Sequence, residues 1–228
     1  MASEMLYDSR DEFPPLMARS AELLHDEVER FQSLLDDLLE ISRFDAGAAV
    51  LAAEPIDLAD LTQTEIDALS GLAERHNTPI SLQVTGPVTA EVDPRRVRRI
   101  LRNLISNAIE HGEQKPIDVY VAGDERGVAI AVRDHGVGFQ ANQVTQVFHR
   151  FWRGDTARAR TLGGSGLGLA ISMEDARLHG GWLNAWGRPG QGAQFRLTLP
   201  RTQGGIVEVS PLPVMPRDYQ PHLDGSGQ

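Results

Sequence analysis

The chain has 228 residues, 41% of them hydrophobic, and a formal net charge of −10 at pH 7. This length suits one or two domains with a buried core, and the acidic balance argues against nucleic acid as the main partner. The absence of cysteine rules out disulfide bonds and cysteine-based zinc sites. No apolar run approaches the roughly 20 residues that a membrane-spanning helix needs.

The cationic residues are 21 arginines and a single lysine, Lys115, which is followed by Pro116. A Walker A loop requires Gly-Lys-Ser/Thr, and a eukaryotic-type protein kinase requires a lysine on a strand. Neither is possible here, so a nucleotide site in this chain would need a different architecture.

Residues 1–45 are predicted to be helical and acidic. The end of one helix is expected over 1–13, and a second helix over 16–44, after two prolines. Apolar residues recur in the second helix at three- and four-residue spacings, which is typical of a helix that packs against another in a hairpin or bundle. His25 lies on this helix and is interpreted as a partly exposed residue rather than a chemical group.

A linker of small residues over 46–56 separates this segment from a domain predicted over 57–200. The domain is expected to begin with a helix, two strands and another helix, over residues 57–76, 79–85, 88–92 and 94–111. Asp93 is a good N-cap for the last of these helices, and Pro94 suits its first position.

The helix over 94–111 carries polar side chains along one stripe. Asn103, Asn107 and His111 are spaced four apart, and each step advances only about 40° around the helix. Asparagine is a poor helix former because its side chain competes for backbone groups. The stripe is therefore either a polar helix flank or a ligand-binding row.

A hairpin expected over 117–122 and 128–132 leads into Asp134, Gly136 and Gly138. A carboxylate at a strand end, followed by Gly-x-Gly, can face a pocket while the backbone opens around it. The same residues also fit an ordinary turn, and both interpretations stay open.

Residues 140–162 lack periodicity and contain Phe148, Arg150, Phe151 and Arg153. Arginine forks suit phosphate, and a long irregular segment between glycine-rich stretches is typical of a mobile lid.

The stretch 162–171 runs from a glycine-rich loop directly into a helix, which is predicted to end near residue 179. Glycines let the backbone approach a ligand, and the helix N-terminus behind them favours an anion, phosphate above all. A last hairpin is expected over 182–186 and 193–199. Residues 201–228, rich in proline and glycine, are predicted to be a disordered tail.

Taken in this order, these stretches resemble the ATP-binding domain of sensor histidine kinases. They match its N box (103–111), G1 box (134–138), F box (148–151) and G2 box (164–168). Residues 1–45 resemble part of the dimerisation and phosphotransfer hairpin that precedes that domain. The resemblance implies an α+β fold: a two-layer α/β sandwich of the Bergerat type, with a mixed sheet and helices on one face, preceded by a helical hairpin.

The resemblance also implies a site for ATP and Mg²⁺. Asp134 would accept a hydrogen bond from the adenine amino group, and Asn107 would ligate Mg²⁺. Asn103 would support the phosphate end, where Arg150 or Arg153 would steady the γ-phosphate, and these three residues are the catalytic candidates. The other residues expected at the nucleotide are His111, Gly136, Gly138, Phe148, Phe151, Gly164, Ser165, Gly166, Leu167 and Gly168.

Two departures from the family pattern bear on this expectation. The acceptor run, of the His-Glu-Leu-Arg-Thr-Pro kind, is absent from the sequence. We therefore expect the acceptor histidine to lie outside this chain, which would bind Mg-ATP without autophosphorylating. Glu110 occupies a position that is often basic in the family, and we expect its carboxylate to point away from the phosphates.

The activity implied is autophosphorylation of a histidine, followed by transfer to an aspartate of a response regulator. A homodimer through the hairpin and a membrane-anchored full-length protein, with this part facing the cytoplasm, are also implied. Two alternatives are an ATPase of the gyrase, Hsp90 or MutL kind and a degenerate module that docks a regulator without turnover. The leucine-rich acidic hairpin argues against the first, and intact Asn107, Asp134 and Gly166 argue against the second.

Overall fold

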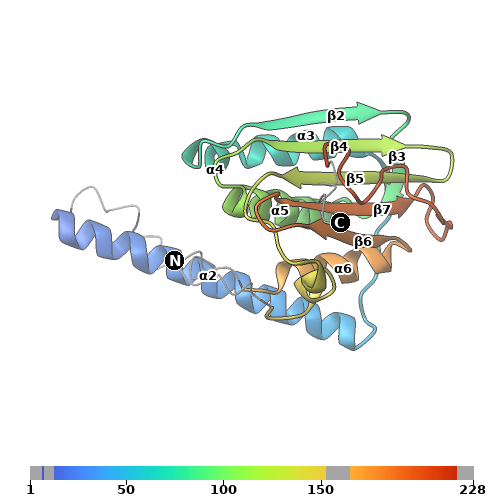
Figure 1. Ribbon diagram of the computed structural model, residues 1–228. Helices are drawn as coiled ribbons and strands as arrows, with labels where there is room; N and C mark the ends of the chain where they lie inside the picture. Colours follow the sequence, from blue (N-terminus) through green and yellow to red (C-terminus); the bar gives the residue numbers. More distant parts are fainter. Residues whose placement is uncertain (1–6, 8–12, 153–164, 220–228) are drawn as a thin grey trace, which may run out of the picture. The chain divides into compact units, whose positions relative to one another are not determined.

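A computed structural model describes residue 7, residues 13–152 and residues 165–219 (Figure 1). The chain divides into two compact units, Met1–Ala49 and Val50–Gln228. In the part of the chain that the structure describes, no helix is long and apolar enough to cross a membrane.

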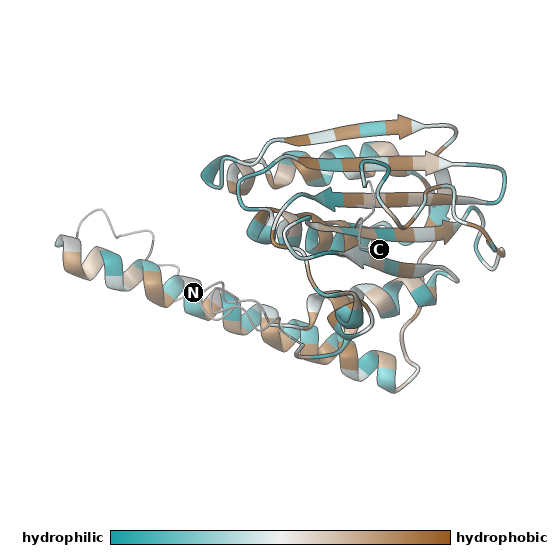
Figure 2. Cartoon of the chain, viewed as in Figure 1, coloured by the Kyte–Doolittle hydropathy of each residue, from teal (hydrophilic) through white to brown (hydrophobic). Residues whose placement is uncertain are grey.

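The first unit contains the long helix α2 (Pro15–Asp45), which the sequence predicts over 16–44. Proline is tolerated in a first helical turn because its missing N–H has no partner there. Gly47, with φ +63°, follows the helix end, where a left-handed residue is common. The apolar residues along α2 alternate with polar ones (Figure 2), and much of the leucine stripe is exposed, including Leu23, Leu24, Phe31, Leu35, Leu38 and Leu39.

The second unit is built on a mixed five-stranded sheet in the order β2-β4-β5-β7-β6. Its strands are β2 (Ile80–Thr85), β4 (Ile117–Gly123), β5 (Gly127–Asp134), β6 (Trp182–Gly187) and β7 (Ala193–Pro200). Strands β2 and β4 are parallel, and the other neighbours are antiparallel. A separate two-stranded sheet pairs β1 (Glu54–Asp57) with β3 (Thr89–Val92).

The helices of this unit lie on one face of the five-stranded sheet (Figure 1). They are α3 (Leu58–Ala68), α4 (Ser70–Arg75), α5 (Pro94–His111) and α6 (Gly168–Leu178), with short 3₁₀ turns at Ala141–Gln143 and Gln146–Phe148. The single helix predicted over 57–76 is divided at Leu69, before Ser70 and Gly71, because glycine weakens a helix. The mixed sheet with helices confirms the predicted fold class.

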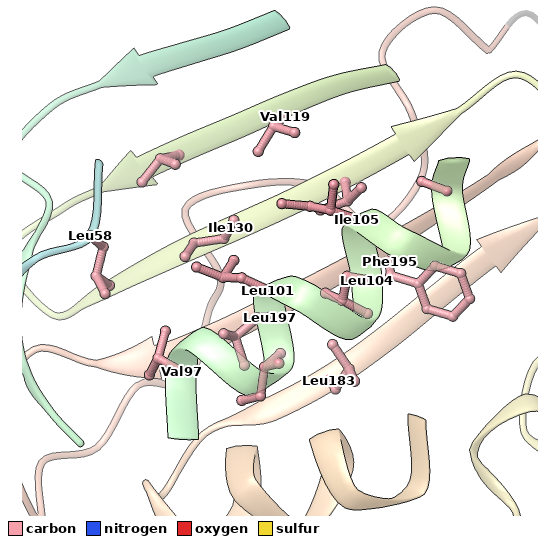
Figure 3. Packing of buried hydrophobic residues seen from close by; sticks show 14 of the residues in the cluster. Leu58, Val97, Leu101, Leu104, Ile105, Val119, Ile130, Leu183, Phe195 and Leu197 are labelled. Atoms are coloured by element: carbon pink, nitrogen blue, oxygen red, sulfur yellow. The ribbon is translucent and has the colours of Figure 1, made fainter. Parts of the chain in front are cut away.

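Helix α5 packs its apolar face on the sheet, as its periodicity predicts. Its buried residues are Val97, Ile100, Leu101, Leu104, Ile105, Ala108 and Ile109, and they meet Val119, Ile130, Leu183 and Leu197 from the strands (Figure 3). Each buried aliphatic side chain contributes about 1.5–3 kcal/mol. Helix α5 is therefore held firmly, which fixes where its polar stripe points.

The opposite face of the sheet is covered in part by the end of the chain. Leu212 is buried against three small side chains, those of Ala122, Ala129 and Ala131. The prediction of a disordered tail is therefore wrong for residues 201–219. Proline and glycine content does not reveal that small outward-facing side chains leave room for an irregular segment. Residues 220–228 lie outside the described part.

Candidate functional site

Asp134 lies at the end of β5, where its carboxylate is almost completely buried at 4% exposure. One oxygen, Oδ1, accepts hydrogen bonds from the backbone N–H groups of Gly136 (3.0 Å) and Ala193 (3.2 Å). Burial raises the pKa of this carboxyl, and the two N–H bonds oppose that shift. Among the described residues, Oδ2 has no hydrogen-bond partner, so this oxygen can accept a hydrogen bond from a ligand.

The glycines after Asp134 allow close packing of protein backbone. A Cβ on Gly136 would lie 1.8 Å from the carbonyl oxygen of His111. Gly138 has φ +61°, and a Cβ there would lie 1.9 Å from the carbonyl oxygen of Arg188. Close backbone packing therefore requires glycine at both positions, whether or not a ligand is bound. The approach of adenine and ribose to these glycines stays a prediction.

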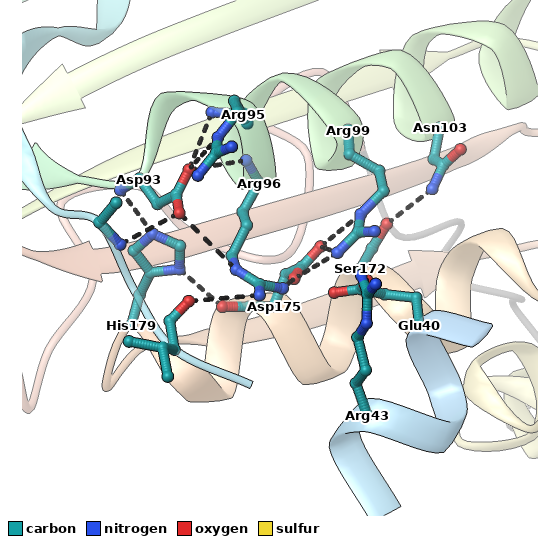
Figure 4. Close-up of polar contacts among 12 residues, drawn as sticks. Glu40, Arg43, Asp93, Arg95, Arg96, Arg99, Asn103, Ser172, Asp175 and His179 are labelled. Atoms are coloured by element: carbon teal, nitrogen blue, oxygen red, sulfur yellow. Dashed lines mark hydrogen bonds and ion pairs between the residues drawn. The ribbon is translucent and has the colours of Figure 1, made fainter. Parts of the chain in front are cut away.

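The two asparagines of α5 are used differently. Asn103 donates from Nδ2 to the carbonyl oxygen of Gly168 (3.0 Å) and to Oγ of Ser172 (3.1 Å), so its amide holds the first turns of α6 (Figure 4). Asn107, one helical turn further on, is half-buried, and its amide makes no hydrogen bond with any described residue. A half-buried, unengaged amide oxygen is a ligand that Mg²⁺ accepts.

The end of α5 lies close to the Asp134 loop. The carbonyl oxygen of His111 accepts a hydrogen bond from the N–H of Val137 at 3.2 Å. Desolvation by the surrounding protein atoms lowers the pKa of His111, and the charge of Asp134 opposes that shift. The residue as a whole is still exposed to solvent. Glu110 is half-buried, and desolvation raises the pKa of its carboxyl. No described contact fixes the direction in which Glu110 points.

The start of the predicted lid is anchored through its aromatic residues. Phe148 packs edge-on against Phe195 of β7, with ring centroids 6.2 Å apart. Phe151 is 65% exposed and has φ +62°, an uncommon and strained conformation for a bulky residue, of the kind that clusters at functional sites. Arg150 is exposed beside it.

The glycine-rich loop contacts both the lid and α5. The N–H of Phe151 donates to the carbonyl oxygen of Gly166 at 2.9 Å, and Gly166 has φ +69°. Gly168 begins α6, where a Cβ would lie 3.1 Å from Cγ of Asn103. Ser165 Oγ accepts from the N–H of Leu167 at 3.1 Å. The side chain of Leu167 is buried at 1% exposure, so only its backbone is suited to a ligand.

Arg153 and Gly164, also expected at the nucleotide, lie outside the described residues. Hydrogen bonds among the described residues join all four boxes. Asn103 binds Gly168, Val137 binds His111, and Phe151 binds Gly166. The fold therefore brings together stretches that are separated along the chain.

A polar seam between α5 and α6 was not predicted from the sequence. Asp175 is completely buried and pairs with Arg96 and Arg99, with nitrogen–oxygen distances of 2.8 Å (Figure 4). His179 Nε2 accepts from the N–H of Asp93 at 3.0 Å, and Nδ1 lies 2.7 Å from the carbonyl oxygen of Asp175. These partners indicate a neutral imidazole with its proton on Nδ1, and desolvation lowers its pKa.

The only sequence signal for this seam is a pair of arginines three residues apart beside the core face of α5. The seam fixes α6, and with it the glycine-rich loop that leads into α6. Across the site, the residues provide a buried acceptor at Asp134, an amide oxygen at Asn107 and a glycine-rich helix start. Such a set suits a nucleotide whose base meets a carboxylate and whose phosphates meet backbone N–H groups.

The family model for the histidine kinase-, DNA gyrase B-, and HSP90-like ATPases matches residues 92–203, so the fold and site define an ATPase domain of this kind. The chain is 54% identical over 219 residues to the sensor histidine kinase MtrB of Mycolicibacterium paratuberculosis, covering 95% of this chain and 38% of that protein. MtrB of Mycobacterium tuberculosis is 51% identical over 217 residues, with the same coverage. The chain belongs to the sensor histidine kinases, and it spans less than half the length of these curated relatives.

Solved structures agree with this assignment. Full-length ShkA in complex with AMPPNP superposes with a TM-score of 0.75 at 25% identity, covering 92% of this chain and 43% of that one. The histidine kinase ThkA in complex with the response regulator TrrA gives a TM-score of 0.66 at 20% identity, covering 84% and 53%, and shows the shared fold.

Proposed function

We propose that this chain is the ATP-binding kinase core of a sensor histidine kinase, which uses Mg-ATP to phosphorylate a histidine and then supports transfer to a response regulator. The observation that carries the proposal is that contacts join the four boxes, one of which contains Asp134 with a second oxygen that has no partner among the described residues. Catalysis of this kind rests mainly on positioning and on neutralising charge at the phosphoryl oxygens.

The base would be held at Asp134. Its Oδ1 is occupied by the N–H groups of Gly136 and Ala193, which leaves Oδ2 for the amino group of adenine. A carboxylate with one oxygen already engaged has a fixed orientation, and that favours one hydrogen-bonded base over others.

The phosphate end would be held by α5, the lid and the start of α6. Asn107 would offer its amide oxygen to Mg²⁺, which supplies charge neutralisation at the phosphates when bound. Asn103 would act indirectly, because its amide is already committed to Gly168 and Ser172. Arg150 and Arg153 are the candidates for the γ-phosphate. A Glu110 carboxylate turned toward the phosphates would repel them, so we infer that it faces elsewhere.

The activity of the whole protein extends this proposal. The relatives named MtrB point to an MtrA-like response regulator as partner, and the exposed leucine stripe of α2 suits dimerisation through a helical hairpin. A membrane-anchored full-length protein, with this core on the cytoplasmic side, completes the proposal.

Isothermal titration calorimetry with Mg-ATP tests the nucleotide site. We expect the chain to bind ATP and Asp134→Asn to bind it at least tenfold more weakly, since a buried acceptor is replaced by an amide that can donate. Asp124→Asn, in the turn between β4 and β5 and so at the opposite end of β5 from Asp134, is the control. Equal affinity of Asp134→Asn and the unsubstituted chain would contradict the adenine assignment.

The reaction is tested with γ-labelled ATP and a chain extended to include an acceptor histidine. Label on a protein histidine supports the kinase. Release of free phosphate alone supports an ATPase of the gyrase kind, and binding without either product supports a docking module.

A further inference from the structure

Residues 206–219 form a segment, here called the C-terminal strap, that lies on the face of the sheet opposite the helices (Figure 1). Leu212, 6% exposed, rests on the three outward-facing alanines of β4 and β5. Val207 is 5% exposed, and a Cβ on Gly127 would lie 2.6 Å from its Cγ2. The alanines and the glycine of the sheet therefore leave the space that Leu212 and Val207 of the strap fill.

The outward row of β7 binds the strap through hydrogen bonds. Gln194 donates from Nε2 to the carbonyl oxygens of Pro213 (3.1 Å) and Val214 (3.0 Å). Arg196 donates to the carbonyl oxygen of Leu212 at 2.6 Å. Since side chains alternate along a strand, this row is the one that does not enter the core. The strap is thus an integral layer of the domain.

The strap reaches the adenine end of the site through Arg133. This arginine is 3% exposed and lies with its guanidinium 5.1 Å from the centre of the Trp186 ring. Its Nη2 and Nε donate to the two oxygens of Asp218, at 3.0 and 3.4 Å. Two-pronged pairing of this kind fixes orientation as well as adding energy.

The same guanidinium donates on its other side to the backbone of the site. Nη1 lies 2.6 Å from the carbonyl oxygen of Asp134 and 3.4 Å from that of Ala193. These two residues are themselves joined, because the N–H of Ala193 donates to Oδ1 of Asp134. Arg133 therefore links the end of β5 to the start of β7, next to the residue that carries the Asp134 carboxylate.

We propose that Asp218 and Arg133 are positioning residues for the adenine-binding carboxylate, so that the C-terminal strap is part of the nucleotide site although it touches no nucleotide. The inference rests on the proposed ATP site. Asp218 holds the guanidinium in the one orientation that reaches both backbone carbonyls. Without it, the buried cation seeks other acceptors and the end of β5 loses its fixed distance from β7.

The test is calorimetry on the full chain with two nucleotides: ATP, and purine ribonucleoside triphosphate, which lacks only the exocyclic amino group. Asp218→Ala should weaken ATP binding about three- to tenfold, the loss of roughly one hydrogen bond. The same substitution should leave the affinity for the analogue unchanged, since the analogue does not use the Asp134 acceptor. Glu208→Ala is the matched control, because Glu208 is an exposed acid of the same strap and makes no hydrogen bond or ion pair with any described residue.

Asp218→Glu, which keeps the charge, should recover most of the ATP affinity, and Asp218→Asn should fall between. Unchanged ATP binding in Asp218→Ala would overturn the proposal. An equal loss for ATP and the analogue would also overturn it, because it would mean general loosening. If the unsubstituted chain binds neither nucleotide, the proposed function itself fails, which is a different result from selective failure of the variant.

Discussion

Gly166→Ala tests how the glycine-rich loop is built. Gly166 has φ +69°, and an added Cβ would lie 3.0 Å from Cα of Phe151 and 3.1 Å from the carbonyl oxygen of Trp152. Left-handed backbone costs an L-residue roughly 1–2 kcal/mol. Relief of the crowding would also disturb the hydrogen bond from Phe151 N–H to the Gly166 carbonyl, worth about 1 kcal/mol. We expect these costs to total about 2–3 kcal/mol, divided between the free energy of unfolding and the free energy of ATP binding.

Part of that loss should appear in nucleotide binding rather than in unfolding, because the loop can shift away from Phe151 while the core stays intact. Urea unfolding measures the first quantity and calorimetry with Mg-ATP the second. We expect about tenfold weaker ATP binding, which corresponds to about 1.4 kcal/mol.

Gly204→Ala is the matched control for this experiment. Gly204 has φ +73°, but nothing lies within 4 Å of an added Cβ. It therefore reports the backbone cost alone, without crowding and away from the site. If Gly166→Ala and Gly204→Ala lose equal stability and both keep ATP affinity, the reasoning about the loop is refuted.

Three further predictions concern the seam and the metal. Asp175→Ala should lower the free energy of unfolding by about 2–4 kcal/mol in urea titrations, since it removes the buried carboxylate that pairs with both Arg96 and Arg99. Glu174→Ala, which removes only a surface pair, should lower it by less than about 1 kcal/mol, and similar values for the two variants would contradict the prediction. The pKa of His179 is depressed in the folded protein, so its contribution to the free energy of unfolding should be complete above the unfolded pKa of about 6.5 and should fall as the pH drops through that value. Between pH 7.5 and 5.5, the free energy of unfolding of His179→Gln should therefore decrease less than that of the unsubstituted chain. An equal decrease in the two would contradict the prediction. Asn107→Ala should weaken Mg-ATP far more than adenosine in calorimetry, and equal losses would exclude the metal role.

The chemistry-bearing stretches could be found from the sequence because their signals are local. The four-residue spacing of Asn103 and Asn107 follows from helix geometry, and the buried face of α5 follows from the same period. Asp134 at a strand end and Gly166 before a helix are also local features. Short-range patterns thus determined most of the elements and the candidate site.

Contacts between distant segments were decided only by the tertiary structure. Strand β1 forms because Glu54 pairs with Val92, and no periodicity in four residues reveals that. The burial of Asp175 between two arginines depends on how α5 and α6 pack. The same packing decides that Asn103 holds α6, whereas the amide of Asn107 binds none of the residues that the structure describes.

The C-terminal strap shows the physical reason most directly. Its prolines, and the glycines before it, predict disorder, because a segment without a regular apolar pattern cannot build a core by itself. The three alanines and Gly127 of the sheet provide the missing surface from elsewhere in the chain, and Arg133 provides a buried cation for Asp218. The sequence by itself determined which residues could meet a nucleotide, whereas only the assembled sheet decided which residues support them from behind.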